Sequence, residues 1–422
     1  MDFIQKLKLI WTDAGLRRRL LFIAGALIVF RLLSSIPVPG VDLLRLESFF
    51  ADNQFFGLLN LFSGGGLANL SIVMLGVGPY ITASIIMQLL TMMSPKLKAM
   101  YQEEGETGRA KFAQYSRLLS VPLALVQAFA FLVLLEQQGV VPELPYFGVL
   151  VNVIIITAGS TLLMWIGELM TEYGIGNGTS IIIFAGIVAS LPQALSQLAF
   201  TFTPADLPVY IAFVVVAAAI VYGVVVVTEA ERPIPVTYAK RVRGMKVYGG
   251  VSTYLPLRVN QAGVIPIIFA LSILLFPQMI ATVLSAVGSD GLKGFAGMLT
   301  SVFANPWVYS VVYFILVFLF TYFYTAVTFD PDTISTNLQK NGAFIPGVRP
   351  GQPTSDYIAQ VLTRITLVGA LFLGLVAVLP LAMQGITGNQ TLAIGGTALL
   401  IVISVALDFM KKVDAQVSMR EY

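Results

Sequence analysis

Ten long apolar runs constrain what this chain of 422 residues can fold into. A helix that crosses the hydrocarbon core of a bilayer needs about 20 mostly apolar residues. With 57% hydrophobic and 11% charged residues, the chain has less than half of the roughly 25% charge typical of a soluble domain. The sequence therefore predicts an all-α polytopic membrane protein with spans at 20–36, 72–92, 118–135, 149–170, 180–198, 209–227, 262–287, 308–329, 365–381 and 392–410.

Basic residues are concentrated on one predicted side of the membrane. With ten spans, 22 of the 25 lysines and arginines share one side, and the exceptions are Arg31, Arg45 and Lys293. Loops rich in lysine and arginine stay in the cytoplasm, so we expect both termini to be cytoplasmic.

Two predicted cytoplasmic loops, 229–258 and 330–360, are longer than ordinary connections. Residues 234–238 and 247–254 alternate β-branched and polar side chains, which predicts a hairpin with a basic tip. Such a tip is compatible with a charged anchoring loop or with a docking site for a large cytoplasmic partner.

Ionisable residues are scarce inside the predicted spans. Arg31 lies in the first span, and Glu168 and Asp408 lie near the cytoplasmic ends of the fourth and tenth. Transporters carry charged groups at membrane depth, so a ten-span secondary transporter is the second interpretation. The chain has no histidine and no cysteine, which removes most catalytic pairs and thiolate metal sites. A membrane enzyme is therefore third, and no cofactor, metal or catalytic site is expected.

Glycine-rich segments precede two of the predicted spans. Segment 57–69 is too short and too interrupted to span, and irregular backbone at membrane depth persists only beside protein or a water-filled cavity. We therefore expect a short re-entrant element there. The second segment, before the fifth span, is Gly174-Ile175-Gly176-Asn177-Gly178.

Several motifs, in their order and spacing, resemble the bacterial SecY family, the pore subunits of the Sec protein-conducting channel. The resemblance covers essentially the whole chain. The motifs are Ile36-Pro37-Val38-Pro39-Gly40, Gly78-Pro79-Tyr80-Ile81, Gly105-Glu106-Thr107-Gly108-Arg109, the glycine segment at 174–178, Tyr238-Ala239-Lys240-Arg241, Leu257-Arg258-Val259-Asn260 and Gly342-Ala343-Phe344-Ile345-Pro346-Gly347-Val348-Arg349-Pro350-Gly351.

The resemblance implies two pseudo-symmetric halves of five spans each, and an odd number of spans per half requires inversion of one relative to the other. An amphipathic segment 1–19 would precede the halves 20–200 and 201–410, and a cytoplasmic tail 411–422 would follow. A hinge is expected near 196–208. A lateral gate is expected between spans two and three and spans seven and eight, with the polar residues Thr82, Ser84, Gln88 and Gln127.

The implied function is conduction of unfolded polypeptide across the bacterial plasma membrane and lateral release of signal or transmembrane segments. An apolar constriction suits a channel that must release every side chain in turn, and it excludes ions by dewetting. The resemblance places the pore ring at Val77, Ile81, Ile183, Ile268 and Ile401, with Thr179 at a further position that is often aliphatic. It places a plug at 57–69, which includes Phe62, Ser63, Gly64, Gly65 and Gly66.

Energy for transport must come from a partner, because the sequence lacks a Gly-x-x-x-x-Gly-Lys-Ser/Thr phosphate loop. The resemblance implies that the SecA motor ATPase or the ribosome supplies it, and that SecE and SecG are membrane partners. The implied docking residues are Lys240, Arg241, Arg243 and Arg349.

Overall fold

The computed structural model describes residues 12–39, 63, 66–67, 70–102, 104–137, 139, 141–142, 145–200, 207–238, 241–243, 246–248, 252–287, 290–387 and 390–418. The fold is mostly helical, and each predicted span overlaps a helix. In chain order these ten helices are α2 (Ala14–Ser34), α5 (Gly78–Met93), α7 (Gly105–Gln137), α8 (Tyr146–Tyr173), α9 (Gly178–Phe200), α10 (Leu207–Glu229), α11 (Ile265–Val287), α13 (Pro306–Thr328), α15 (Gln352–Thr387) and α16 (Gln390–Ser418).

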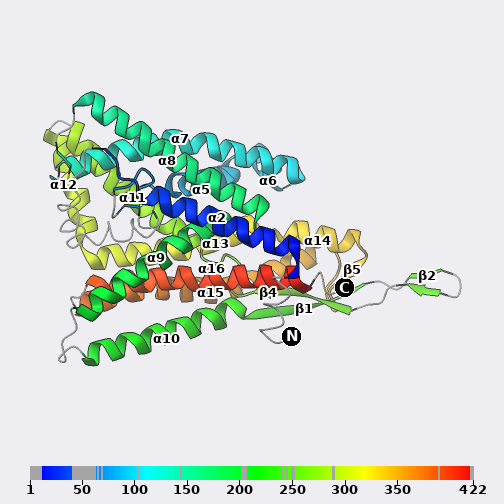
Figure 1. Cartoon of the computed structure of the whole chain (residues 1–422). Helices are drawn as coiled ribbons and strands as arrows, with labels where there is room; N and C mark the ends of the chain where they lie inside the picture. The colour runs from blue at the N-terminus through cyan, green and yellow to red at the C-terminus, as the bar shows by residue number, and fades with distance from the viewer. Residues whose placement is uncertain are drawn as a thin grey trace.

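The long helices lie roughly side by side, with the strands gathered at one end of the bundle (Figure 1). We call this the sheet end. The first turn of α2 and the last turn of α16 both lie at this end (Figure 1). Among the described residues, the main contacts between helices of the two predicted halves are those of α11 with α5 and α7 and of α16 with α9.

Among the described residues, four helical stretches are long and apolar enough to cross a membrane by length and composition. They are Gly105–Glu136, Tyr146–Tyr173, Pro306–Lys340 and Gln352–Leu379. Shorter apolar stretches occur at Gly78–Met93, Gly178–Ser190, Val214–Glu229 and Ile265–Leu274. The chain thus has several helices capable of spanning a membrane, and the count of ten stays a prediction.

Helix boundaries differ from the apolar runs where backbone chemistry intervenes. The second run begins at residue 72, but α5 begins only at Gly78. Residues 71–77 form tight turns instead, in which the amides of Met74 and Gly76 donate to the carbonyls of Ser71 and Val73. Gly76 has a positive φ of 57°, a conformation that glycine adopts without strain and that breaks a helix.

Three further helices were not predicted from the apolar runs: α6 (Pro95–Gln102), α12 (Asp290–Ala304) and α14 (Pro331–Lys340). They lie in what the sequence suggested were loops. In α14 the Asp330 side chain accepts a hydrogen bond from the Asp332 amide, and Pro331 occupies the first turn, an ordinary start for a helix.

The predicted hairpin is confirmed, with its second strand displaced. Strand β1 (Glu231–Tyr238) pairs antiparallel with β4 (Ser252–Arg258), and β5 (Ala343–Phe344) pairs with the other edge of β1. Residues 247–254, predicted as one strand, are divided between β4 and β3 (Lys246–Tyr248). Strand β3 pairs with β2 (Arg241–Arg243) in a small hairpin that projects beyond the sheet (Figure 1).

The buried apolar side chains of the described residues form three clusters. The largest joins α2, α5, α8, α9, α10, α11, α13, α15 and α16. A second packs α7 and α8 against residues around Leu67 and Met74. A third lies under the sheet and packs Ile234 and Val236 of β1 against Ile358 and Val361 of α15. The alternating burial of β1 explains why its sequence alternates.

Close packing of α8 and α9 depends on glycine. A Cβ added to Gly178 would lie 2.0 Å from the Gly167 carbonyl oxygen, and the Gly178 amide donates to the Thr171 hydroxyl at 2.8 Å. We expect Gly178→Ala to lower the free energy of unfolding by about 1–3 kcal/mol through overpacking. A thermal melt in detergent measures this. Gly294→Ala in α12, which has open space around it, should not lower the midpoint, because alanine favours a helix interior more than glycine does.

Candidate functional site: an aliphatic ring beside a polar cavity

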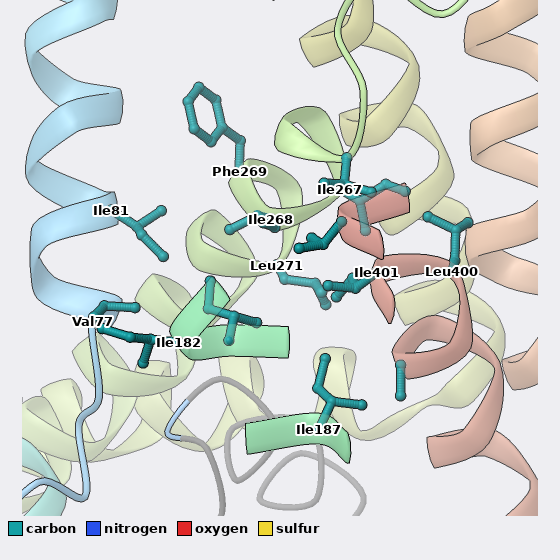
Figure 2. Close-up of a cluster of buried hydrophobic side chains, with 14 of the residues drawn as sticks. Val77, Ile81, Ile182, Ile187, Ile267, Ile268, Phe269, Leu271, Leu400 and Ile401 are labelled. Atoms are coloured by element: carbon teal, nitrogen blue, oxygen red, sulfur yellow. The ribbon is translucent and has the colours of Figure 1, made fainter. Parts of the chain in front are cut away.

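Four of the nine helices in the largest buried cluster carry the residues proposed as a pore ring. The five residues proposed as a pore ring all belong to this cluster and are at most 9% exposed. Figure 2 shows α5, α9, α11 and α16 around the same space. The five residues are Val77, Ile81, Ile183, Ile268 and Ile401.

The start of α5 places two of the five residues. Val77 is the N-cap of α5, and the Ile81 amide donates to the Val77 carbonyl at 3.1 Å. Residues four apart lie on the same face of a helix, so Val77 and Ile81 face the cluster together (Figure 2).

More apolar residues surround the ring than the sequence indicated. Ile182, Ile187, Ile267, Phe269, Leu271 and Leu400 lie in the same close-up (Figure 2). The spans are so rich in aliphatic residues that neither composition nor periodicity singles out these six, and no sequence signal was available to find them.

A cavity of about 490 Å³ borders the ring. Three of the ring residues, Ile81, Ile183 and Ile268, line one part of it. Most of the remaining lining residues are polar and come from α5, α7, α8, α9, α13 and the segment between α8 and α9, beside the apolar Ala113, Ile265 and Phe269. The polar members are Tyr80, Ser84, Gln88, Arg117, Glu168, Thr171, Glu172, Asn177, Thr179, Ser180 and Tyr324.

An ion pair crosses the edge of this cavity. The Arg117 guanidinium of α7 donates to the Glu168 carboxylate of α8 at 2.5 Å. The Arg117 side chain is 48% exposed, so the pair contributes little to stability. It nevertheless gives the cavity a charged rim beside the uncharged aliphatic residues.

A second cavity of about 320 Å³ shares Asn177, Ser180, Ile265 and Tyr324 with the first. It opens toward the sheet end, since Arg258 of β4 lines it. Lys411 and Lys412 of α16 also line it. Lys411 pairs with Glu229 at 2.7 Å, and Lys412 pairs with Asp408 at 2.6 Å.

The four polar residues predicted for a lateral gate are only partly brought together. Ser84 and Gln88 line the larger cavity, and the Gln88 Oε1 atom is buried with no hydrogen-bond partner among the described residues. Thr82 and Gln127 are buried and are not among the residues that line either cavity.

Most of the predicted plug lies outside the described residues, including Phe62, Gly64 and Gly65. Ser63 and Gly66 are described and buried, and both lie in turns. The Ser63 hydroxyl accepts a 2.9 Å hydrogen bond from the Leu67 amide, and Leu67 joins the second apolar cluster.

Three of the four predicted docking residues are described, and they lie at or beyond the sheet end. Lys240 lies outside the described residues, and Arg241 and Arg243 form the outer hairpin strand β2. Arg349 is exposed in the turn between β5 and α15. Within the described part of the chain, no group of three or more acidic, histidine or cysteine residues is arranged to hold a metal ion.

Comparison with known proteins identifies the fold around this site. The family model named SecY matches residues 71–410. The protein translocase subunit SecY of Mycobacterium leprae is 43% identical over 428 residues, which cover 96% of each chain. The chain belongs to the SecY family. It is therefore a multi-pass membrane protein of the protein translocase, and its relatives are named as translocase subunits.

Solved structures agree with this SecY-family assignment. One SecY structure aligns with a TM-score of 0.66 and 19% identity, over 96% of this chain and 93% of that one. The plug domain of that SecY protein is described as stabilising the closed state of the translocation channel and maintaining a membrane seal. Sec61 in the canine ribosome-channel complex aligns with a TM-score of 0.63 and 18% identity, over the same shares. At these identities the likeness establishes the shared fold.

Proposed function

We propose that unfolded polypeptide passes through the centre of the helix bundle and that the ring of Val77, Ile81, Ile183, Ile268 and Ile401 closes this path at rest. The observation that carries the proposal is the convergence of five aliphatic residues, spread over more than three hundred positions of sequence, in one buried cluster. An aliphatic constriction excludes water and ions without binding any particular side chain.

The larger cavity supports a direction of entry. It brings polar groups up to Ile81, Ile183 and Ile268 from one side, so a hydrated chain can reach the ring before it meets an apolar surface. Nearly all the basic charge of the sequence lies on that predicted side. We therefore propose that the protein lies in the plasma membrane of a bacterial cell, with both termini in the cytoplasm and the cavity facing it.

Lateral release requires the two halves to separate along one seam. The proposed seam runs between α5 and α7 on one side and α11 and α13 on the other, with Thr82, Ser84, Gln88 and Gln127 near it. Its support is that α11 contacts both α5 and α7. The unpartnered Gln88 oxygen leaves this seam less tightly bonded than an ordinary helix interface.

Segment 57–69, with Phe62, Ser63, Gly64, Gly65 and Gly66, is proposed as a plug that blocks the path at rest. The burial of Ser63 and Leu67 supports a packed resting position. A related SecY protein is described as having a plug domain that stabilises its closed state, which favours the same role here.

The proposed partners are the SecE and SecG membrane subunits, the SecA motor and the ribosome. Lys240, Arg241, Arg243 and Arg349 are the proposed contacts for the motor and for ribosomal RNA. The support is the projecting β2–β3 hairpin (Figure 1) and the related Sec61 channel, which was solved in a ribosome complex. Contacts with phosphate backbones should weaken as salt rises.

Reconstitution tests the proposed function. We expect vesicles that contain this chain with SecE and SecG to protect a signal-bearing precursor from added protease when SecA and ATP are supplied. Omission of ATP, or use of a precursor without its signal, should leave the precursor digestible. Equal protection with and without the channel subunits would contradict the proposal.

A further inference from the structure

The turn that precedes α5 is packed directly against α8. A Cβ added to Gly159 would lie 2.1 Å from the Ile72 carbonyl oxygen, so no side chain fits between helix and turn at this point. One residue further along α8, the Ser160 hydroxyl donates a 2.9 Å hydrogen bond to the Gly76 carbonyl oxygen. Ser160 is 4% exposed, and this bond is therefore made away from solvent.

This contact is one residue away from the constriction. Gly76 immediately precedes Val77, which is the N-cap of α5 and the first residue of the proposed ring. The Ile81 amide then donates to the Val77 carbonyl. Figure 2 shows Val77 at the point where the helix passes into the preceding segment. The position of Gly76 therefore decides where the helical turn that carries Val77 and Ile81 begins.

The other side of the turn is tied to the end of α2. The Ile72 amide donates to the Ile36 carbonyl at 2.9 Å, and the Val38 amide donates to the Leu70 carbonyl at 2.8 Å. Pro37 and Ser71 form an isolated antiparallel bridge. The turn is thus held between two elements, and the contact with α8 is the one nearest to the ring.

We propose that Gly159 and Ser160 are positioning residues for the constriction. They hold the turn before α5 so that Val77 and Ile81 meet the residues of α9, α11 and α16. This inference rests on the proposed function, because it assigns a support to the same ring. Its consequence is that a substitution in α8 opens the seal although neither side chain belongs to the ring.

Ion flux through vesicles that contain the resting channel tests the role of Ser160. In Ser160→Ala the buried Gly76 carbonyl loses its hydrogen-bond donor. We expect the resting leak to rise roughly tenfold, because loss of one buried hydrogen bond shifts an equilibrium between two positions of the turn by about this factor. Ser160→Thr keeps a hydroxyl and should leak far less. Thr161→Ala is the matched control, since the Thr161 hydroxyl donates to Thr157 of its own helix, and it should leave the seal intact.

Gly159→Ala tests the same contact by steric means. The added methyl must push Ile72 away, so we expect a larger leak than for Ser160→Ala. Gly25→Ala in α2, where nothing lies within 4 Å of the added carbon, should leave the resting leak unchanged. Thermal melts of each variant in detergent separate a displaced turn from an unfolded chain.

The two proposals fail in distinguishable ways. If Ser160→Ala and Gly159→Ala stay folded and tight while direct ring variants leak, the positioning role is wrong and the ring stands. If direct ring variants also stay tight, the ring itself is wrong. A leak from Thr161→Ala equal to that from Ser160→Ala would also overturn the positioning role, because any loosening of α8 would then suffice.

Discussion

Vesicles that contain the Ile81→Gly, Ile183→Gly double variant are expected to conduct ions at rest, while vesicles with the unmodified chain stay tight. Ile81 and Ile183 belong to the same buried cluster, and both border the polar cavity. Removal of both side chains lets water from the cavity enter the constriction. Since about 1.4 kcal/mol shifts an equilibrium tenfold, loss of two buried side chains should raise the resting conductance on the order of tenfold or more.

A matched pair of substitutions separates loss of the seal from loss of stability. Ile220 of α10 and Ile358 of α15 are also buried, at 8% and 0% exposure, but neither belongs to the proposed ring. Buried isoleucine-to-alanine changes cost about 2–5 kcal/mol each, and changes to glycine cost at least as much. Ile220→Gly, Ile358→Gly should therefore melt at a similarly lowered temperature yet keep the bilayer closed. Equal leakage from the two double variants would contradict the ring assignment.

The positions of the long helices could be predicted from the sequence, because hydropathy over about 20 residues reports burial in lipid. Their ends could not be predicted in the same way. Residues 72–77 are apolar like the helix that follows, but the positive φ of Gly76 and the tight turns around it are local backbone features that hydropathy ignores. The second predicted span therefore started six residues too early.

Short polar or amphipathic helices were missed for a related reason. A search for apolar runs does not detect α14, although its Asp330-Pro331 start is a recognisable helix signal. The β1–β4 hairpin was detected because alternation is a direct sequence signal. Its second strand was placed wrongly, since residues 247–254 are divided between β3 and β4 and β4 continues to Arg258.

The ring and the cavity differ in how well they could be predicted from the sequence. Aliphatic residues fill every span, so the five ring residues came from family resemblance rather than from any pattern. The cavity is assembled from several helices whose mutual positions no single stretch encodes. Arg117 and Glu168, for example, are fifty-one positions apart and share an ion pair, and nothing in the spacing of the two residues indicates it.

Arg349 is presented by a turn with a well-defined conformation. The Val348 amide donates to the Ile345 carbonyl at 3.1 Å, and the Thr354 hydroxyl donates to the Arg349 carbonyl at 2.8 Å. The Ser335 hydroxyl of α14 fixes the far end of the turn through the Gly351 carbonyl at 2.7 Å. An exposed arginine on a turn held by these bonds loses little backbone entropy when it binds, which suits a contact surface for a partner.

Reversal of this charge should stop motor-driven transport without unfolding the chain. We expect Arg349→Glu to reduce SecA-dependent protection of a precursor on the order of a hundredfold, since loss of one partner of a buried charge pair at an interface costs about 2–5 kcal/mol. The thermal midpoint should stay close to that of the unmodified protein, because Arg349 is exposed and exposed charges contribute little to stability.

Lys340→Glu provides the control for this effect. Lys340 is an exposed basic residue at the end of α14 in the same region. Its substitution by glutamate therefore makes the same change of charge without altering the turn at 345–351. If long-range electrostatic attraction alone recruits the motor, both variants should lose activity together, and both should recover at low ionic strength, where screening of the remaining basic residues is weakest. If the guanidinium makes a specific contact, Arg349→Glu alone should lose activity, and Arg349→Lys should recover only part of it, because lysine cannot bind a carboxylate in the bidentate geometry of arginine. Normal transport by Arg349→Glu would remove this residue from the docking surface.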